Sequence, residues 1–492
     1  MIYDYLVIGA GISGLVTASI LAQDGFKVAL FERSEKIAPV VRGFSRNGVH
    51  FDTGFHYSGG LGKGEILDRI FRYIGIADDL DIFPFQKDGF DIFRDADTGE
   101  EFRFPVGYGP LAEVLNSVNK GDRQEVDQYL RVVQKTCDNL PFLNQDVKYD
   151  PFRGLHGATL LEVLEKHISD PYLRYLLSLH TLLYGTEPSG APFELHAGVV
   201  GLYYKSVHGI KGGGAALIKV FKNRIEELGV KLINGRAVRK ILFTDAGDIN
   251  GVELDDGEIV PGRSCVATVH PKTFLEMVPE KFHRPAYRKR ILGLKDTPSA
   301  YLLFAKCKEP IPMIKGANLF LGNSQNTISD TAGPLDWRTI YITHAHSLDS
   351  RDGAGGVVAI CPTTAASTAR WSESSRKNRP EAYLRFKANI MSQLQKRIED
   401  GFPEIKGKIQ FIAGATPLTI RDFTGNLTGS LYGVKHSIKQ YNPQIRTSVP
   451  GLFLAGQGTV APGVLGSALS AVVSCGYILG HNKLQRELWD HQ

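Results

Sequence analysis

The sequence predicts a two-domain α/β fold, in which a Rossmann-type domain binds a nucleotide and a second domain combines a mixed sheet with helices. Three observations lead to this prediction. A glycine-rich turn separates a strand from a helix within residues 5–33, a second such turn lies within 450–476, and strand and helix patterns occupy the chain between them. With 492 residues, the chain is long enough for two or three domains.

The composition argues against several classes of protein. Apolar residues make up 43% of the chain, and the net charge of +5 is not gathered in a block of Lys and Arg, so we expect no nucleic-acid partner. The five cysteines lack the spacing of metal ligands or redox pairs, so we expect neither a metal site nor a disulfide framework. The apolar run at 5–8 lacks a basic n-region and leads straight into the glycines, so we expect no signal peptide, and the apolar tract at 463–480 is rich in Gly and Ser, which indicates a buried helix. We therefore expect a cytoplasmic protein.

The first glycine-rich turn follows the short apolar run "DYLVIGA" and precedes a helix that ends at Gly25. Gly9 allows the tight turn, Gly11 lets the backbone approach a diphosphate, and Gly14 lets the helix pack closely on the strand. The helix N-terminus offers free N–H groups and a partial positive charge to the diphosphate. Glu32 ends the next strand, "KVALFER", where a carboxylate accepts hydrogen bonds from ribose hydroxyls. This stretch predicts a cofactor that contains ADP.

Two later stretches distinguish FAD from NAD. "HFDTGFHY" at 50–57 follows the first βαβ unit, and 450–476 has the pattern of a strand, a glycine turn and a helix that begins near Val464. This second helix N-terminus suits the ribityl chain and the C2 carbonyl region of a flavin. A nicotinamide enzyme needs no second clasp of this kind, and the sequence has no second G-x-G-x-x-G after an apolar strand. The two stretches therefore favour FAD.

Further stretches follow the order of motifs found in one group of flavoproteins. "FDTGFHYSGG" after residue 50 is similar to the retinol-saturase form of that group's second motif. Residues 209–241, "VATVHPKTF" at 266–274 and "GATPLTIRDFTGNLTGSLYGVKHS" at 414–437 also match the group's pattern. With these motifs, the chain resembles the phytoene desaturase, carotenoid isomerase and retinol saturase group of FAD-dependent oxidoreductases. The resemblance implies FAD, a glutathione-reductase-like nucleotide-binding domain and a hydrophobic polyene or isoprenoid substrate.

The resemblance also implies a domain division and a set of cofactor contacts. The FAD-binding domain would comprise 1–75, 205–285 and 445–492, and the substrate-binding domain would comprise 76–204 and 286–444. A backbone group of Val238 would lie against adenine. The residues expected to bind the cofactor are Gly9, Gly11, Ile12, Ser13, Gly14, Glu32, Arg33, Arg42, Gly54, Phe55, His56, Val238, Gly456, Gln457, Val464, Leu465 and Gly466.

The chain departs from the group at two places. The group carries a Gly-Gly pair shortly after the ribose-binding acid, where this chain has Val40-Val41 in a shortened loop. Because β-branched residues remove close backbone approach, we expect a flavin that is shifted, more weakly bound, or bound only alongside substrate. Arg42 remains as a contact to the diphosphate or the flavin. Gln457 stands where many flavoproteins place an acid against the ribityl hydroxyls, and its amide can hold the same hydroxyl.

The expected substrate half contains an apolar stretch at 170–209, where Leu, Tyr and Phe recur at loosely helical spacing. Such a stripe forms an ordinary helical core or lines an apolar tunnel that meets the flavin, and the pattern leaves both interpretations open. Residues 297–308 and 337–346 have the pattern of strands in the substrate-domain sheet. Residues 401–412 have the pattern of a connection and a returning strand.

The sequence shows no pattern of a Ser/His/Asp triad, no HExxH motif and no carboxylate pair. This absence fits an enzyme whose flavin carries the hydride while the protein orients the substrate and keeps the pocket dry. His56 and Tyr57 are the first candidates for a proton donor or acceptor, because they follow the second motif directly. Tyr432 and His436 come next. For His56, and for His208 before the glycine run at 212–214, an ordinary buried histidine is the alternative.

Three functions remain open from the sequence. The leading hypothesis is a saturase, desaturase or cis-trans isomerase that acts on CH–CH or C=C bonds of a polyene. A flavin amine oxidase shares the fold. In that class we expect an aromatic pair that flanks the substrate before the C-terminal glycine turn and helix, where this chain has one Tyr441. A non-catalytic lipid-binding protein, similar to the Rab escort and GDP-dissociation-inhibitor proteins, is favoured only by the loss of the Gly-Gly pair. The electron donor or acceptor is open, and a water-insoluble substrate leads us to expect peripheral membrane contact.

Overall fold

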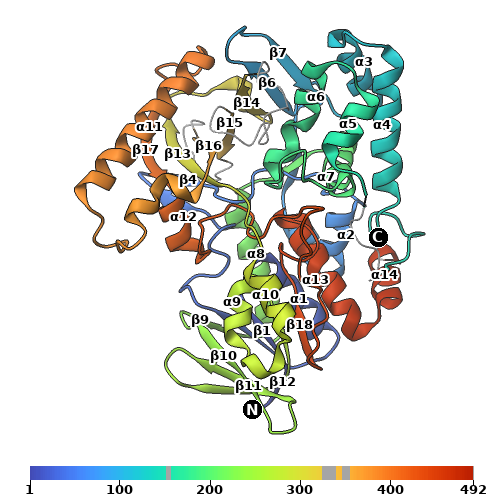
Figure 1. Cartoon of the computed structure of the whole chain (residues 1–492), viewed down its shortest axis with the longest axis vertical. Coiled ribbons are helices and arrows are strands. Elements are labelled where there is room, and N and C mark those ends of the chain that lie inside the picture. The colour runs from blue at the N-terminus through green and yellow to red at the C-terminus, as the bar shows by residue number, and fades with distance from the viewer. Residues whose placement is uncertain (151–156, 324–338, 346–354, 491–492) are drawn as a thin grey trace.

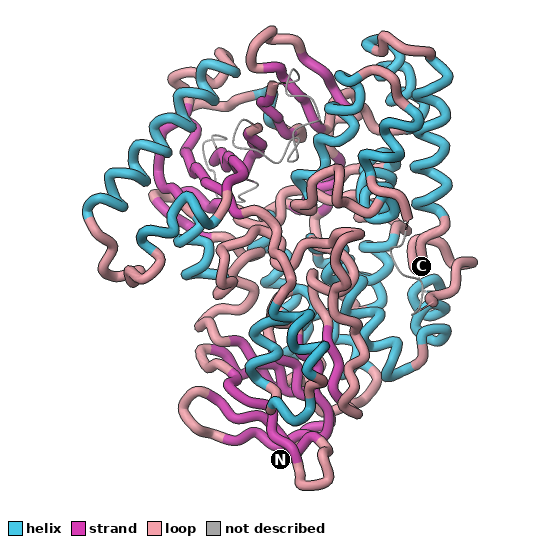
Figure 2. The backbone as a smooth tube through the Cα atoms, viewed as in Figure 1, coloured by secondary structure: helices cyan, strands magenta, loops and turns pink. Residues whose placement is uncertain are grey.

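Two seven-stranded sheets organise the molecule, one in each lobe of the computed structural model, which describes residues 1–150, 157–323, 339–345 and 355–490 (Figures 1 and 2). The first sheet has the strand order β10-β11-β12-β1-β2-β9, and β18 pairs with β12. Its strands are β1 (Tyr3–Ile8), β2 (Val28–Glu32), β9 (Lys231–Asn234), β10 (Val238–Phe243), β11 (Ile249–Leu254), β12 (Ile259–Ala267) and β18 (Leu452–Leu454).

The centre of the first sheet is parallel, because β1 runs parallel to both β2 and β12, and β18 runs parallel to β12. All residues of β2 are buried, as expected for a strand covered on both faces. One face packs against α1 (Ile12–Gln23), α8 (Gly213–Glu227) and α13 (Gly463–Leu479), with α2 (Ile66–Tyr73) and α14 (His481–Asp490) beside them. On the other face, side chains of β1 and β2 pack with those of the antiparallel strands β10 and β11, which join the sheet through β12, and with α9 (Pro271–Met277). Helix α10 (Pro285–Leu292) lies next to α9.

The second sheet has the order β17-β13-β16-β15-β14-β6-β7. Its strands are β6 (Asp91–Asp95), β7 (Glu101–Phe104), β13 (Ser299–Cys307), β14 (Asn318–Gly322), β15 (Ile340–Ala345), β16 (Gly356–Thr363) and β17 (Ile409–Ala415). Helix α11 (Glu381–Gly401) buries Met391, Leu394 and Ile398 against one face, and α12 (Pro417–Thr424) follows β17. The predicted strand at 297–308 corresponds to β13, and the predicted connection and strand at 401–412 correspond to the turn after α11 and the start of β17. The prediction at 337–346 covers β15, while residues 337, 338 and 346 lie outside the described residues.

A helical group stands beside β6 and β7 on the side of the upper lobe away from α11 (Figure 1). It comprises α3 (Tyr108–Val118), α4 (Arg123–Asp138), α5 (Leu160–His167), α6 (Pro171–Ser178) and α7 (Phe193–Lys205). The apolar stretch at 170–209 therefore forms α6, a short 3₁₀ segment and α7, and many of its side chains belong to a buried core. Two small two-stranded sheets lie outside the large sheets. One pairs β3 (Phe44–Arg46) with β4 (Val49–Phe51), and the other pairs β5 (Ile82–Pro84) with β8 (His208–Ile210).

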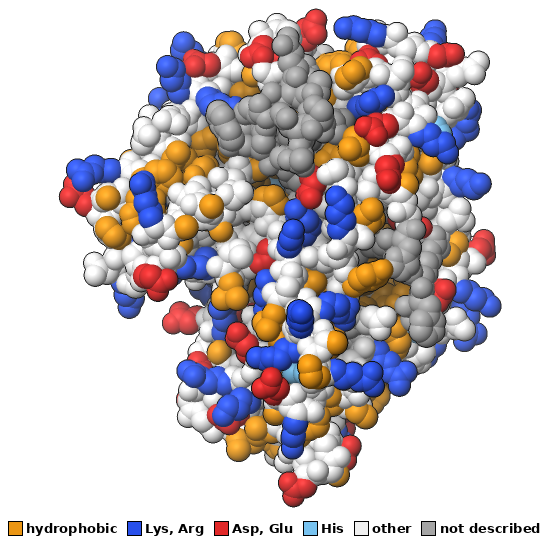
Figure 3. Space-filling view, in the orientation of Figure 1, with side chains coloured by type: hydrophobic (Ala, Val, Ile, Leu, Met, Phe, Trp, Pro, Cys, Tyr) orange, Lys and Arg blue, Asp and Glu red, His pale blue; other side chains and the backbone are white. Residues whose placement is uncertain are grey.

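Segments distant in the sequence meet in the first sheet, since its strands come from residues 3–32, 231–267 and 452–454. The exact domain boundaries stay a prediction. On the face shown in Figure 3, Lys and Arg side chains lie among Asp and Glu side chains instead of forming one block. Within the described ranges, no helix is both long enough and apolar enough to cross a membrane.

Candidate functional site

The turn between β1 and α1 leaves room for a ligand directly at the helix N-terminus. Gly9 has a φ of 101°, and a Cβ on Gly9 would lie 2.6 Å from Oγ1 of Thr268. A Cβ on Gly14 would lie 1.8 Å from the carbonyl oxygen of Gly9, so only glycine lets α1 approach the turn this closely. A Cβ on Gly11 would meet nothing within 4 Å, because Gly11 faces a cavity. This open space in front of free N–H groups fits a diphosphate.

Glu32 lies at the carboxyl end of β2 and faces the same cavity. Its two carboxylate oxygens accept hydrogen bonds from the backbone N–H groups of Ala10 (3.2 Å) and Ser34 (2.9 Å). These bonds fix the carboxylate next to the glycine turn and leave lone pairs on both oxygens. Glu32 can therefore accept bonds from ribose hydroxyls, and Arg33 lines the cavity beside it.

The Val40-Val41 pair is accommodated by glycines on the opposing segments. A Cβ on Gly54 would lie 2.6 Å from Cγ1 of Val40, and a Cβ on Gly214 would lie 1.8 Å from the carbonyl oxygen of Val41. The backbone of residues 54 and 214 thus occupies the space next to the two valines. Arg42 follows the pair, lines the cavity, and its buried Nε has no hydrogen-bond partner among the described residues. An unpaired guanidinium N–H at this position fits an anionic group of a cofactor.

The C-terminal turn places a second helix N-terminus against the same cavity. Gly456 has a φ of 116°, and its N–H donates to Oγ of Ser470 on α13 (2.8 Å). Oγ of Ser13 on α1 donates to the carbonyl oxygen of Ser467 on α13 (2.8 Å), which ties the two helices together near their N-termini. The sequence-predicted turn and helix therefore lie beside the first glycine turn. Taken together, these features fit FAD: a recess in front of α1, a carboxylate for ribose, an unpaired cation and a second helix N-terminus.

Two cavities meet at this site. The cofactor cavity, of about 1110 Å³, extends from the glycine turn to the second sheet, and the apolar cavity has a volume of about 580 Å³. The residues that line both cavities, and so form the junction, are Gly54, His56, Ile360, Leu431, Tyr432, Thr459, Gly463 and Val464.

The residues predicted to contact the cofactor fall into three groups. Most of them line the cofactor cavity, and three of these belong to the junction as well: Gly9, Gly11, Ile12, Ser13, Glu32, Arg33, Arg42, Val238, Gly456 and Gln457, with Gly54, His56 and Val464 at the junction. Phe55, Leu465 and Gly466 line the apolar cavity instead. Gly14 lines neither of the two, because it packs behind the turn.

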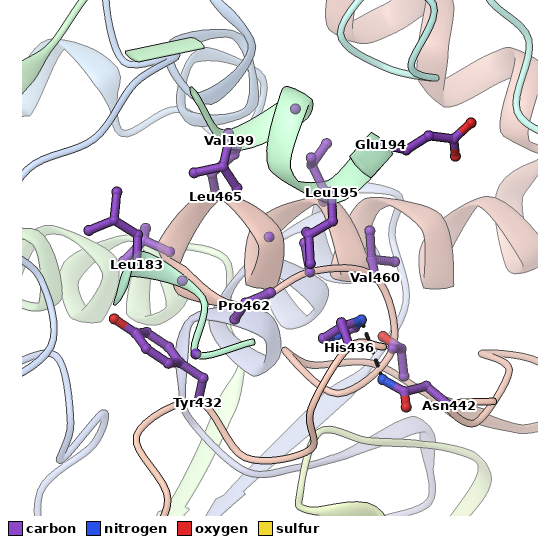
Figure 4. A pocket seen from close by; sticks show the side chains of 18 of the residues that line it. Leu183, Glu194, Leu195, Val199, Tyr432, His436, Asn442, Val460, Pro462 and Leu465 are labelled. Carbon is purple, nitrogen blue, oxygen red and sulfur yellow. Dashed lines mark hydrogen bonds between the residues drawn. The ribbon is translucent and has the colours of Figure 1, made fainter. Parts of the chain in front are cut away.

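Hydrophobic side chains from several elements surround the apolar cavity. Figure 4 shows Leu183, Leu195 and Val199 gathered with Val460, Pro462 and Leu465 around it. The first group comes from the 3₁₀ segment and α7, and the second comes from the C-terminal turn and α13. The apolar stretch at 170–209 thus contributes both a buried core and part of this lining.

His56 lies at the junction of the two cavities. Its ring nitrogens Nδ1 and Nε2 are both buried and have no hydrogen-bond partner in the described part of the chain. Burial lowers the pKa of His56 to about 4, so the imidazole is neutral near pH 7. A neutral imidazole with one free N–H and one free lone pair can either give or accept a proton.

Tyr57 lines the apolar cavity, but its hydroxyl group is already bonded. The hydroxyl donates to Oδ2 of Asp91 (2.9 Å), and burial, followed by the charge of Asp91, raises the pKa of Tyr57 well above its usual range. The ring stacks on Tyr341, with centroids 6.3 Å apart and planes at 17°. Tyr57 is therefore a poor proton donor and forms a fixed aromatic wall.

The other candidates occupy different positions. Tyr432 belongs to the junction and donates to the carbonyl oxygen of Leu182 (3.0 Å). His436 lines the apolar cavity and its Nε2 donates to the carbonyl oxygen of Gln457 (2.6 Å). His208 lies on β8 and lines neither of the two cavities.

Sequence patterns missed the partners of Tyr57. Asp91 binds His180 and Asn318 as well as Tyr57, across separations of 89 and 227 residues. Asp91 stands in the strand pattern "DIFRD" and His180 in the apolar helical stretch, where neither has motif spacing. Only the pairing of β6 with β14 brings Asp91 opposite Asn318.

Residues 12–475 match the family described as flavin containing amine oxidoreductase. The all-trans-retinol 13,14-reductase of Rattus norvegicus is 24% identical over 525 residues, covering 97% of this chain and 86% of that protein. The 4,4'-diaponeurosporene oxygenase of Staphylococcus aureus (strain USA300) is 24% identical over 495 residues, covering 93% of this chain and 94% of that protein.

Solved structures share the fold over almost the whole chain. An oxidoreductase from Methanosarcina mazei aligns with a TM-score of 0.69 at 17% identity, covering 96% of this chain and 99% of that chain. A putrescine oxidase bound to putrescine aligns with a TM-score of 0.65 at 14% identity, covering 97% and 99%. These similarities establish a two-domain FAD-binding fold, as the sequence predicts.

Proposed function

Because the chain belongs to the flavin containing amine oxidoreductase family and is an FAD-dependent oxidoreductase, we propose that it acts on C=C or CH–CH bonds of a hydrophobic polyene or isoprenoid lipid. The observation that carries this proposal is the apolar cavity of about 580 Å³, which meets the cofactor cavity at His56. The names of the retinol reductase and the diaponeurosporene oxygenase describe polyene substrates of this kind. The reaction is a saturation, a desaturation or an isomerisation.

In this proposal, residues 1–75, 205–285 and 445–492 form the cofactor domain. The N-terminus of α1 and Arg42 would hold the diphosphate, Glu32 the ribose, and the N-terminus of α13 the flavin end of the cofactor. When bound, FAD supplies the acceptor or donor of a hydride. The remaining predicted contacts, including Val238 and Gln457, line the same cavity.

The protein's own part in this reaction is to orient the polyene, to exclude water and to move a proton. Hydrophobic side chains around the apolar cavity would align the chain with the junction and keep it dry. His56 is the candidate proton carrier, because it lies at the junction and neither of its ring nitrogens has a partner among the residues that the structure describes. Tyr57 would contribute its ring as a wall, since its hydroxyl is bonded to Asp91.

Two measurements test this function. The purified protein should show flavin absorption bands that bleach with anaerobic dithionite, and carotenoids and retinoids should then be converted in a product assay by chromatography. Putrescine serves as the control substrate, because a putrescine oxidase shares the fold. A colourless protein that FAD does not reconstitute would contradict the enzyme assignment and favour a lipid-binding protein. Peroxide release with amines but not with polyenes would instead favour an amine oxidase.

We also propose that the protein is cytoplasmic and binds peripherally to a membrane, and that it takes its substrate from this membrane. Leu384 on α11, Phe423 on α12 and Leu427 after α12 are exposed by 54%, 47% and 63%. Leu384 and Phe423 also line the outer part of the cofactor cavity, together with Arg376 and Lys387. Apolar and cationic side chains in one region suit the surface of an anionic bilayer. Liposome flotation tests this contact, and equal flotation of L384D/F423D and the unsubstituted chain would contradict it.

A further inference from the structure

Asp91 is a carboxylate buried beneath the wall of the apolar cavity. It is fully buried on β6 and accepts three hydrogen bonds. Tyr57 Oη and His180 Nε2 donate to Oδ2 at 2.9 Å each, and Asn318 Nδ2 donates to Oδ1 at 2.8 Å. The amide of Asn318 is fixed in turn, because its Oδ1 accepts from Oγ1 of Thr343 (2.8 Å). Three donors stabilise the ionised form of a carboxyl group.

No cation neutralises this carboxylate in the described part of the chain. Among the described residues, His180 is the partner that could form an ion pair with Asp91, and Nδ1 of His180 is buried without a hydrogen-bond partner there. A protonated ring would bury an N–H group with no acceptor, whereas a neutral ring leaves only a lone pair unpaired. The geometry therefore favours a neutral His180 that donates from Nε2, and the net negative charge stays on Asp91.

One layer of tyrosine side chains separates this charge from the apolar cavity. Tyr57, Tyr203 and Tyr341 line the cavity. The rings of Tyr57 and Tyr203 lie 4.9 Å apart, and those of Tyr57 and Tyr341 lie 6.3 Å apart. Aromatic faces attract cations, and the attraction grows where water is excluded. The tyrosine rings thus stand between the apolar cavity and the negative charge of Asp91.

We propose that Asp91 and this tyrosine wall stabilise positive charge on a polyene in the apolar cavity. The inference rests on the proposed function and specifies the charge of the reacting substrate. A hydride that leaves a CH–CH unit would pass with its electron pair to bound FAD, and a delocalised carbocation would remain on the polyene. Loss of a proton from the neighbouring carbon to His56, the candidate proton carrier, would then complete the double bond. Saturation follows the same path in reverse, with the proton added first and the hydride second. In either direction, a fixed negative charge lowers the energy of the cation.

The other titratable groups at the cavity do not supply this charge. The pKa of His56 is about 4, and burial raises the pKa of Tyr203 and Tyr432, so these groups are neutral near pH 7. Two further carboxylates line the cavity. Asp150 is exposed to solvent, and Figure 4 shows the side chain of Glu194 pointing away from Leu183, Tyr432 and Pro462. Asp91 is reached only through Tyr57, so a substrate ammonium group could not contact it directly.

The test compares two ligands of equal length on the full chain with its flavin. One is a polymethine cation with dimethylamino ends, whose positive charge is spread over the conjugated chain. The other is the uncharged polyene of the same length and branching. Dissociation constants of both are measured anaerobically for the unsubstituted protein and for D91N, H180Q and E194Q. Asp91→Asn removes the charge and keeps the shape, whereas His180→Gln perturbs the same buried cluster and keeps the charge.

We expect D91N to lose about tenfold in its preference for the cation over the neutral polyene, which corresponds to about 1.4 kcal/mol. Its affinity for the neutral polyene should stay within about twofold, and H180Q and E194Q should keep the preference. An unchanged preference in D91N, or an equal loss in H180Q, would overturn the inference. If D91N does not fold, the two dissociation constants of the unsubstituted protein test the inference. A cation that binds tenfold more weakly than the neutral polyene would overturn the inference. Failure to bind either ligand would instead contradict the proposed function and the inference with it.

Discussion

At the scale of single residues, His56 is set apart by its position as well as by its bonding. His196 contacts the hydroxyl groups of Tyr184 and Tyr129, and His436 donates to a carbonyl. Both ring nitrogens of His481 are buried without a partner in the described residues, but His481 lines neither cavity. The ring nitrogens of His56 have no partner in the described ranges, although they are buried at the junction of two cavities. A polar group left unpaired in a protein interior costs stability, and such groups are concentrated where a ligand or a reaction uses them.

His56→Gln should therefore reduce polyene turnover by about a hundredfold or more, the usual contribution of a proton-transferring side chain. The flavin content should stay unchanged, because Gln fills a similar volume without titrating. Steady-state turnover under anaerobic conditions measures this effect. His208→Gln is the matched control, since His208 lines neither of the two cavities, and its turnover should stay within about twofold. Equal losses in the two variants would contradict a role for His56 in proton transfer.

His196 makes the fold sensitive to acid. It is fully buried, and burial lowers its pKa to about 3, whereas an unfolded chain has a histidine pKa near 6.5. Below pH 6.5 the unfolded state binds a proton that the folded state does not, so stability falls as the pH falls. Between pH 6.5 and pH 4.5, the unfolding free energy of both proteins should fall. The fall should be about 2 kcal/mol smaller in His196→Gln than in the unsubstituted chain. Denaturant titrations at the two pH values measure the difference, and parallel losses would show that His196 is protonated in the folded state.

At the scale of elements, the unit formed by β1 and α1 separates the packing role of glycine from its binding role. Gly14→Ala places a methyl group against the backbone of Gly9, whereas the methyl group of Gly11→Ala would extend into the open cavity. G14A should lose about 1–3 kcal/mol of unfolding free energy in the absence of FAD. G11A should lose less than about 1 kcal/mol. Both should bind FAD at least about tenfold more weakly, by flavin fluorescence titration. Undiminished FAD affinity in G11A would show that the diphosphate does not approach this turn.

The elements of the cofactor site were predictable because each carries a local signal. Gly9, Gly11 and Gly14 follow an apolar strand at fixed spacing, and the turn at Gly456 precedes a helix in the same way. The Val40-Val41 pair shows the limit of such signals. Its effect depends on Gly54 and Gly214, which lie beside the valines only in the folded chain. The role of Asp91 could not be predicted either, because its partners His180 and Asn318 come from a helical segment and a strand that lie far along the chain.

At the scale of the whole molecule, the cofactor cavity lies between the two sheets. It is lined by Gly11 and Glu32 from the first sheet's connections, and by Leu302, Phe304 and Ala415 from β13 and β17. A cofactor held there would contact both lobes and link their stabilities. FAD at a hundred times its dissociation constant should therefore stabilise the folded chain by about 2.7 kcal/mol. Thermal unfolding should show one transition with FAD, and removal of FAD should lower its midpoint and increase proteolysis between the lobes. An unchanged midpoint would indicate that FAD does not bind the folded chain.

The hydrogen bond between α1 and α13 also has a consequence for folding during synthesis on the ribosome. Ser13 and Ser467 are 454 residues apart, so the second half of the cofactor site leaves the ribosome long after the first. At roughly 5–20 residues per second, the delay amounts to tens of seconds or more. During this interval, β12 lacks its neighbour β18, and α1 lacks the helix that covers it. The nascent chain must keep this apolar surface protected until the last helices emerge, and FAD can complete the site only at the end of synthesis.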